Sequence, residues 1–176
     1  MKVVFLDIDG VLNNAYIEER IGSIVGIGDI YVKRLRKIID ATGAKIVLTS
    51  SWRVYKAPKG EDIYWDYLVE KLAKEGLSIY DCTKDRGDNR GYGILQWYTH
   101  HDVTTWVVLD DEEFDDYRPY GIMRRLVKTR YYTPDGGLQD ENVEEAIRIL
   151  NGEETTRRKS KQQFDGNRSM ASKRCI

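Results

Sequence analysis

The chain has 176 residues, of which 41% are hydrophobic and 32% are charged, and its formal net charge is −1. This length is typical of one domain, because domains usually contain about 100–200 residues. No apolar run approaches the roughly 20 residues that cross a bilayer, and the N-terminal residues do not have the pattern of a signal peptide. The cysteines, Cys82 and Cys175, lie too far apart for a disulfide framework. We therefore expect a cytoplasmic protein without a membrane partner.

The net charge is distributed unevenly. Residues 152–176 contain seven Lys or Arg and three Asp or Glu, so this segment carries +4 and residues 1–151 carry −5. The segment is rich in Ser, Thr and Gln and poor in apolar residues, which is typical of a flexible tail. We expect one folded domain over residues 1–151, followed by this basic tail. A basic tail can attract nucleic acid, although a solvated tail is the commoner case.

The first predicted element is a buried strand that contains Val3 to Leu6. It runs directly into Asp7 and Asp9, which are followed by Gly10. A continuous apolar run of this length indicates a strand of a parallel sheet that is covered on both faces. Residues 14–28 contain three glycines and some alternation of apolar and polar positions. We expect a small β-hairpin, or flap, in that segment rather than a separate domain.

Helical and strand-like segments alternate in the rest of the chain. Asp29 and Asp140 are the expected N-caps of the first and last helices. Strands that alternate with helices predict an α/β domain with a doubly wound, mostly parallel sheet and helices on both faces. We expect helices over residues 29–42, 61–75, 92–100 and 140–150, and strands over residues 45–48, 77–81, 105–109 and 126–129.

Three of the predicted strands end in polar residues. Because the carboxyl ends of parallel strands lie at one edge of a sheet, these side chains should meet there. Carboxylates without a cluster of His or Cys favour Mg²⁺, and protein-bound Mg²⁺ usually engages a phosphate as well. Hydroxyl groups can bind phosphoryl oxygens, and a carboxylate can act as a nucleophile. The residues are Asp7 and Asp9, Thr49 and Ser50, and Asp110 and Asp111.

These motifs resemble the haloacid dehalogenase (HAD) superfamily of phosphotransferases. The segment Asp7-Ile8-Asp9-Gly10 is similar to its DxDG element, and the strands that end at Thr49 and at Asp110-Asp111 are similar to two further elements. More narrowly, the sequences TSSWR, RGYGILQW, LDDE and TPDGGLQDENVEEAIRIL resemble the HAD domain of Swiss Army Knife RNA repair proteins. The resemblance implies a HAD-like Rossmannoid fold with a minimal cap domain or none.

The resemblance also implies roles for the site residues. Asp7 would attack phosphorus and become a phosphoaspartate, and Asp9 would protonate the leaving oxygen and later deprotonate water. Mg²⁺ would be held by the carboxylate of Asp7, by Asp110 and by the backbone carbonyl of Asp9, with Asp111 close by. Thr49 and Ser50 would hold the phosphoryl group.

The cation that neutralises the phosphoryl group is the part that departs from the family pattern. Arg90 is the preferred candidate, because a helix is expected to start there and helix N-termini bind anions. Lys84 and Arg86 lie in the same charged loop and remain alternatives. Trp52 and Arg53 follow the hydroxyl residues directly, so we expect them to contact the substrate.

Three functions are compatible with this pattern. The first is a Mg²⁺-dependent phosphomonoesterase that acts on nucleotides or polynucleotide phosphate ends, which the open site, the basic tail and the RNA-repair resemblance favour. The second is a small-metabolite phosphatase with residues 14–28 as its lid. The third is a non-catalytic nucleic-acid-binding module, although binding alone would not require both Asp7 and Asp9. No obligate protein partner is implied.

Overall fold

The computed structural model of the protein describes residues 1–84 and 89–153. The predicted basic tail falls almost wholly on residues 154–176 and so lies outside the described residues. The same holds for Arg86, one of the alternative cations, because residues 85–88 are also outside them.

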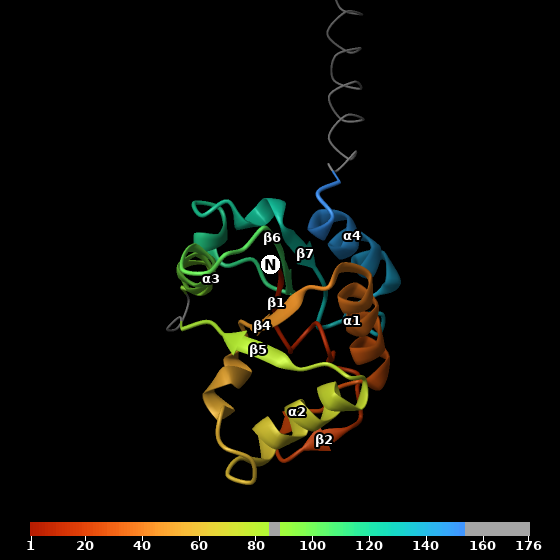
Figure 1. Ribbon diagram of the computed structural model, residues 1–176. Coiled ribbons are helices and arrows are strands. Elements are labelled where there is room, and N and C mark those ends of the chain that lie inside the picture. Colours follow the sequence, from red (N-terminus) through yellow and green to blue (C-terminus); the bar gives the residue numbers. More distant parts are fainter. Residues whose placement is uncertain (85–88, 154–176) are drawn as a thin grey trace, which may run out of the picture.

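A five-stranded sheet forms the centre of the domain (Figure 1). Its strand order is β5-β4-β1-β6-β7, and every neighbouring pair is parallel. The chain starts in the middle at β1, adds β4 and β5 on one side, and returns to add β6 and β7 on the other. This reversal creates a topological switch point beside β1, where open α/β sheets bind their ligands. The strands are β1 (Lys2–Leu6), β4 (Lys45–Leu48), β5 (Ile79–Cys82), β6 (Thr105–Asp110) and β7 (Leu126–Lys128).

Helices cover both faces of this sheet, as predicted. Helices α1, α2 and α4 contribute to the core on one face, and α3 packs on the other together with two short 3₁₀ helices. Figure 1 shows α3 and α4 on opposite sides of the central strands. No described helix combines the length and the apolar character that crossing a bilayer requires. The bounds are α1 (Asp29–Thr42), η1 (Ser51–Tyr55), α2 (Ile63–Lys74), α3 (Arg90–Thr99), η2 (Asp115–Tyr117), η3 (Ile122–Arg124) and α4 (Asp140–Leu150).

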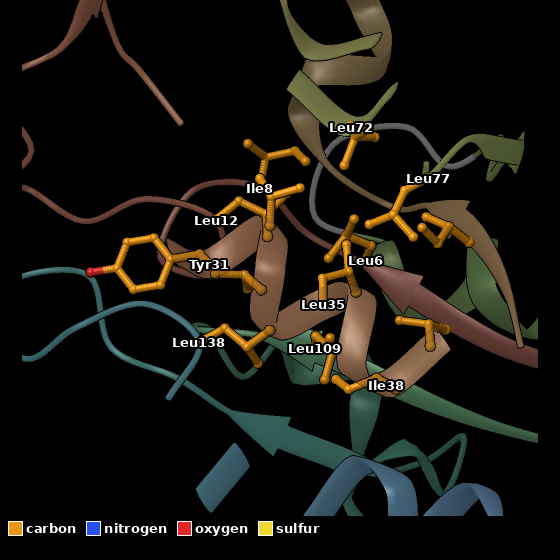
Figure 2. Packing of buried hydrophobic residues seen from close by; sticks show 14 of the residues in the cluster. Leu6, Ile8, Leu12, Tyr31, Leu35, Ile38, Leu72, Leu77, Leu109 and Leu138 are labelled. Atoms are coloured by element: carbon orange, nitrogen blue, oxygen red, sulfur yellow. The ribbon is translucent and has the colours of Figure 1, made fainter. Parts of the chain in front are cut away.

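The apolar run of β1 is explained by the two cores that it separates. Val4 and Leu6 belong to the larger cluster, whereas Val3 and Phe5 belong to the smaller one. Successive side chains of a strand point to opposite faces, so a strand covered on both sides must be apolar at every position. Figure 2 shows Leu6 packed among the side chains of α1 and α2 in the larger cluster. This packing fixes the position of β1, and therefore the position of the residues that follow it.

The N-caps of two helices differ from the prediction. Gly28 rather than Asp29 is the N-cap of α1, and Gln139 rather than Asp140 is the N-cap of α4. Both aspartates instead lie in the first turn and bind cations from other helices: Asp29 accepts a hydrogen bond from Lys71 Nζ at 2.9 Å, and Asp140 forms ion pairs with Arg34 and Lys37. A carboxylate in the first turn still interacts favourably with the helix dipole. Their side chains therefore take part in tertiary ion pairs instead of helix caps.

The flap contains the predicted hairpin, formed by β2 (Arg20–Ile21) and β3 (Ile24–Val25). It is tied to α2 by a buried lysine. Lys71 Nζ lies 2.9 Å from a carboxylate oxygen of Glu19 in the flap, and Glu19 also accepts a hydrogen bond of 2.7 Å from Tyr67. The Tyr67 hydroxyl in turn accepts from the backbone N–H of Ile27 at 2.7 Å. These contacts hold both ends of the hairpin against α2.

We expect Lys71→Met to loosen the flap, because Glu19 then loses its cationic partner. Trypsin should cleave after the exposed Arg20 several-fold faster in this variant, because proteolysis of a folded protein follows the population of locally opened states. Lys74→Met, one turn further along α2 at an exposed position, is the control. Equal cleavage rates in the wild type and in Lys71→Met would show that the ion pair does not hold the hairpin.

Candidate active site

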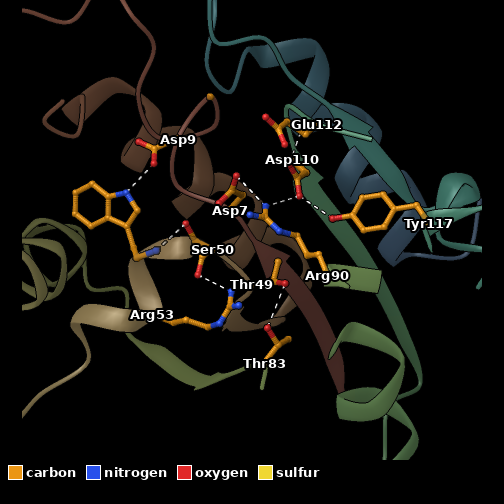
Figure 3. Close-up of polar contacts among 12 residues, drawn as sticks. Asp7, Asp9, Thr49, Ser50, Arg53, Thr83, Arg90, Asp110, Glu112 and Tyr117 are labelled. Carbon is orange, nitrogen blue, oxygen red and sulfur yellow. Dashed lines mark hydrogen bonds and ion pairs between the residues drawn. The ribbon is translucent and has the colours of Figure 1, made fainter. Parts of the chain in front are cut away.

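The backbone hydrogen bonds of the sheet continue beyond the ends of β1 and β4 and align the predicted site. The Asp7 N–H donates to the Leu109 carbonyl at 3.0 Å, and the Thr49 N–H donates to the Leu6 carbonyl at 2.9 Å. The residues that follow β1, β4 and β6 therefore meet at one edge, as predicted (Figure 3). Asp110 is the last residue of β6, one position later than the predicted strand end.

Asp7, Asp110 and Asp111 form an acidic cluster in which one carboxylate oxygen of each lies within 4.8 Å of the others. Asp7 and Asp110 are buried. Burial and the charge of Asp110 raise the pKa of Asp7 to about 7, although Arg90 and hydrogen bonds from Ser50 and Ile8 oppose this. The same two causes raise the pKa of Asp111 to about 6. The cluster thus holds more negative charge than its protein partners neutralise, and its oxygen donors fit a hard divalent cation.

Gly10 allows Asp111 to approach the turn after β1. Its φ of +73° lies in the left-handed region, and a Cβ at this position would lie 2.3 Å from Cγ of Asp111. Any larger residue would therefore be strained in its backbone and would displace the Asp111 carboxylate. The glycine of the DxDG element is needed for the shape of the acidic cluster as well as for the turn.

Within residues 1–84 and 89–153, Arg90 is the cation that reaches the acidic cluster. Its Nη1 lies 3.0 Å from Asp7 Oδ2 and 2.8 Å from Asp110 Oδ2, and its guanidinium group lies over the Phe114 ring at 4.4 Å. The Tyr117 hydroxyl donates a hydrogen bond of 2.7 Å to the same oxygen of Asp110. Lys84, the alternative cation, is exposed and lines a hollow between β5 and α3 with Trp97 and His101.

The N-terminus of α3, where we expected a site for the anionic phosphoryl group, binds an aspartate of the protein instead. The backbone N–H groups of Gly91 and Tyr92 donate to the Asp116 carboxylate at 3.0 and 2.9 Å, so the protein itself supplies the anion at this helix N-terminus. Arg90 reaches the site through its side chain instead. Asp116 belongs to the acidic segment, residues 112–120, that follows β6. Sequence reasoning missed its role because it lies 25 residues from Gly91 and comes from a separate loop.

Asp9 lies beside the cluster and has its own partners. Its Oδ1 accepts a hydrogen bond of 2.8 Å from Asn13 Nδ2, and its Oδ2 accepts one of 2.9 Å from Trp52 Nε1. Trp52 was expected to contact substrate, but the structure buries its ring, with 2% of the residue exposed, and directs its N–H to Asp9. Asn13 is a second partner of Asp9 that sequence reasoning missed, although its position just after the DxDG element is a usable signal.

The hydroxyl residues lie at the carboxyl end of β4. Thr49 and Ser50 are fully buried, and Thr49 Oγ1 accepts a hydrogen bond of 3.3 Å from Thr83 Oγ1 at the end of β5. Arg53 Nη1 donates to the Ser50 carbonyl at 2.8 Å. The Ser50 side chain also hydrogen-bonds to Asp7. The predicted phosphate-binding hydroxyls therefore lie beside Asp7, and Arg53 supports the backbone that carries them. Contact between Arg53 and a substrate stays a prediction.

Two aromatic residues near the site were not predicted. The pKa of Tyr131 is raised, first by burial and then by the negative charge of Asp9, while Arg20 of the flap opposes the shift. The ring of Tyr132 contacts that of Tyr131 edge to face at 4.9 Å, and Tyr132 is 81% exposed. A pair of adjacent tyrosines in the turn-rich segment before Pro134 is a signal that the sequence does contain.

We expect Asp7→Asn to stabilise the metal-free protein at neutral and alkaline pH. The pKa of Asp7 rises from 3.8 to about 7 on folding, so the folded protein binds more protons than the unfolded chain between these values. Stability therefore falls as pH rises through this range. In EDTA, the variant should unfold on the order of 10 °C above the wild type at pH 8. A rise in the pKa from 3.8 to about 7 corresponds to about 4 kcal/mol, and about 1 kcal/mol corresponds to ~2–4 °C at this chain length.

The difference in unfolding temperature should shrink as the pH is lowered from 8 to 4, because Asp7 of the folded protein becomes protonated below its pKa of about 7. Thermal unfolding followed by circular dichroism measures both values. Asp102→Asn, at an exposed position, is the matched control and should unfold like the wild type at each pH. A variant that is no more stable than the wild type at pH 8 would contradict the assignment of a costly buried charge.

The comparisons with known proteins agree with this geometry. The family model described as the HAD domain in Swiss Army Knife RNA repair proteins matches residues 3–143. No curated protein and no solved structure gives a significant match to the chain. The matched region covers most of the chain and includes every residue of the site described above. The five-stranded sheet also has the α/β layout expected of this family. The predicted resemblance is therefore confirmed: the chain belongs to the family of HAD domains found in Swiss Army Knife RNA repair proteins.

Proposed function

We propose that this protein is a Mg²⁺-dependent phosphomonoesterase that works through a phosphoaspartate on Asp7. The observation that carries the proposal is the environment of the Asp7 carboxylate. It is buried, it shares an acidic cluster with Asp110 and Asp111, and Arg90 lies 3.0 Å from one of its oxygens. HAD membership supports a hydrolase, and this constellation of charges suits an anionic, phosphorylated substrate.

Mg²⁺ is the ion that we assign to the acidic cluster. The side chains of Asp7 and Asp110, the backbone carbonyl of Asp9 and the nearby Asp111 would hold it. All of these donors are oxygens, which this ion prefers. When bound, the ion would reduce the repulsion between an anionic nucleophile and an anionic phosphoryl group.

The first step of the proposed reaction uses Asp7 as the nucleophile. One of its carboxylate oxygens attacks phosphorus, and the bond to the leaving oxygen breaks. The hydroxyls of Thr49 and Ser50 and the guanidinium group of Arg90 hold the phosphoryl oxygens, on which negative charge is concentrated. Arg90 is well suited to this task because a guanidinium group remains charged and binds oxyanions with several N–H groups.

Asp9 transfers the protons. As a carboxylic acid it gives its proton to the leaving oxygen, and the resulting carboxylate then takes a proton from the water that hydrolyses the phosphoaspartate. This second step releases inorganic phosphate and restores both aspartates. The partition of roles agrees with the structure, because Asp7 belongs to the acidic cluster and Asp9 lies beside it with separate hydrogen-bond partners.

Nucleotides or polynucleotide phosphate ends are the substrates that we propose. The exposed ring of Tyr132 offers a face on which a base can stack. The pKa of the neighbouring Tyr131 is raised by burial and then by the charge of Asp9, so this pair lies near the proposed acid/base group. The RNA repair proteins named in the family description suggest the same substrate class. The alternative, a small-metabolite phosphatase with the flap as its lid, is disfavoured by the contacts of Lys71 and Tyr67 that tie the flap to α2.

The proposal predicts hydrolysis of p-nitrophenyl phosphate that requires Mg²⁺ and is abolished by EDTA. Asp7→Asn should lower kcat by about 10³-fold or more, because the nucleophile is lost. Asp102→Asn should retain wild-type activity. Unchanged hydrolysis by Asp7→Asn would refute the assigned nucleophile. Salt-sensitive RNA or DNA binding without any turnover would favour the non-catalytic binding module.

A substrate panel tests the leaving group. We expect kcat/KM to be higher for 3′- or 5′-phosphorylated oligonucleotides and nucleoside monophosphates than for sugar phosphates. Tyr132→Ala should raise KM for oligonucleotides about tenfold, since stacking on one aromatic ring contributes about 1–3 kcal/mol per base. It should leave the hydrolysis of acetyl phosphate unchanged.

Tyr80→Ala, which removes an exposed tyrosine at the far edge of the sheet, is the control for Tyr132→Ala. It should leave KM unchanged for every substrate. A preference for sugar phosphates that is insensitive to Tyr132→Ala would favour the small-metabolite phosphatase.

A further inference from the structure

Both carboxylate oxygens of Asp9 are held by side chains from different segments. The Trp52 indole donates to Oδ2 at 2.9 Å from the 3₁₀ helix η1, and the Asn13 amide donates to Oδ1 at 2.8 Å from the segment that follows the DxDG turn. Figure 3 shows Asp9 directed toward the indole, whereas Asp7 is joined to Arg90. Two directional hydrogen bonds from separate segments restrict the rotation of a short side chain. The position of Asp9 is therefore defined independently of the acidic cluster.

Trp52 also connects Asp9 to the segment that follows β4. Its backbone N–H donates to Ser50 Oγ at 3.4 Å, so one residue contacts both the proposed phosphate-binding hydroxyl and the proposed acid/base group. Its ring is buried and packs edge to face on Tyr55 at 6.1 Å. A buried indole N–H without a hydrogen-bond partner is costly. The packing of the ring and the hydrogen bond to Asp9 therefore both favour the inward orientation of the Trp52 side chain.

Asn13 has a comparable linking role on the other side of Asp9. It is fully buried, and its Oδ1 accepts a hydrogen bond of 3.0 Å from the Gly10 N–H. Its amide group also lies 3.4 Å from the Val25 carbonyl of the flap. Asn13 therefore ties Asp9 to the turn after β1 and to the hairpin.

We propose that Trp52 and Asn13 are positioning residues that hold the Asp9 carboxylate where it can protonate the leaving oxygen, and that Trp52 aligns it with the phosphate-binding hydroxyls. This inference rests on the proposed phosphatase function. A displacement of about 1 Å in a reacting group can lower a rate by about 10²-fold, so the loss of one hydrogen bond should have a measurable effect. The effect should depend on the leaving group.

The dependence follows from the chemistry of the step. An alkoxide is a poor leaving group and needs a proton as the bond to phosphorus breaks, whereas p-nitrophenolate is stable enough to leave without one. A residue that acts through Asp9 should matter for alkyl phosphates and matter little for aryl phosphates. A residue that only stabilises the fold should affect both substrates equally.

The experiment compares Trp52→Phe with Trp97→Phe on β-glycerol phosphate and p-nitrophenyl phosphate. Trp97 is a matched control, because it is also buried and its Nε1 also donates to an aspartate, Asp81, at 2.7 Å. Trp52→Phe should lower kcat about 10- to 100-fold for the alkyl phosphate and less than about threefold for the aryl phosphate, with KM unchanged for both. Trp97→Phe should leave kcat unchanged for both substrates.

A double-mutant cycle adds a second readout. Once Asp9→Asn has removed the acid, adding Trp52→Phe should cause no further loss of kcat with the alkyl phosphate. The effects of two substitutions are not additive when both act through the same group. Asn13→Ser, which shortens the other donor, should give the same leaving-group pattern and serves as the test variant if Trp52→Phe does not fold.

Each result decides the inference. Equal losses for the two substrates, or a Trp52→Phe variant that behaves like Trp97→Phe, would overturn the positioning role while leaving the phosphatase function intact. A wild-type protein that hydrolyses neither substrate in the presence of Mg²⁺ would instead overturn the proposed function, and the positioning role with it.

Discussion

The burial of two carboxylates, Asp7 and Asp110, at the ends of neighbouring parallel strands is the constraint on which the rest of this structure depends. The strands cannot move apart, because their side chains pack in the two cores on either side of the sheet. The charges are therefore held together out of water, where an uncompensated carboxylate is costly. A raised pKa at Asp7 is the expected consequence. Much of the surrounding architecture reduces this cost.

Besides the hydrogen bonds from Ser50 and Ile8, this compensation comes from α3 and from the segment that follows β6. Arg90 at the start of α3 binds Asp7 and Asp110, while Tyr117 binds Asp110 and Asp116 holds the amides of α3. Phe114 covers the guanidinium group. The acidic loop after β6 thus orients the cation that partly neutralises the acids before it. The remaining negative charge is what makes the site suitable for a divalent ion.

The fold could be predicted because its signals are local. Continuous apolar runs indicated strands covered on both faces, and helical spacing indicated the elements between them. Their alternation was enough for the doubly wound architecture, and residues at three strand ends were enough for the acidic cluster and the hydroxyls beside it. Element ends were less accurate: β5 and α3 are each shifted by about two residues, because tertiary contacts rather than propensity decide where a helix or strand stops.

The sequence by itself determined that Asp7, Thr49 and Asp110 would meet, since parallel strands place their carboxyl ends at one edge whatever the surrounding detail. Only the tertiary structure decided the partners of these residues. It selected Arg90 over Lys84, used Asp116 rather than a bound anion at the start of α3, and turned the indole of Trp52 inward to Asp9. Those choices depend on side chains that lie far apart in the chain. Their hydrogen bonds and charges interact only after the sheet and helices have packed.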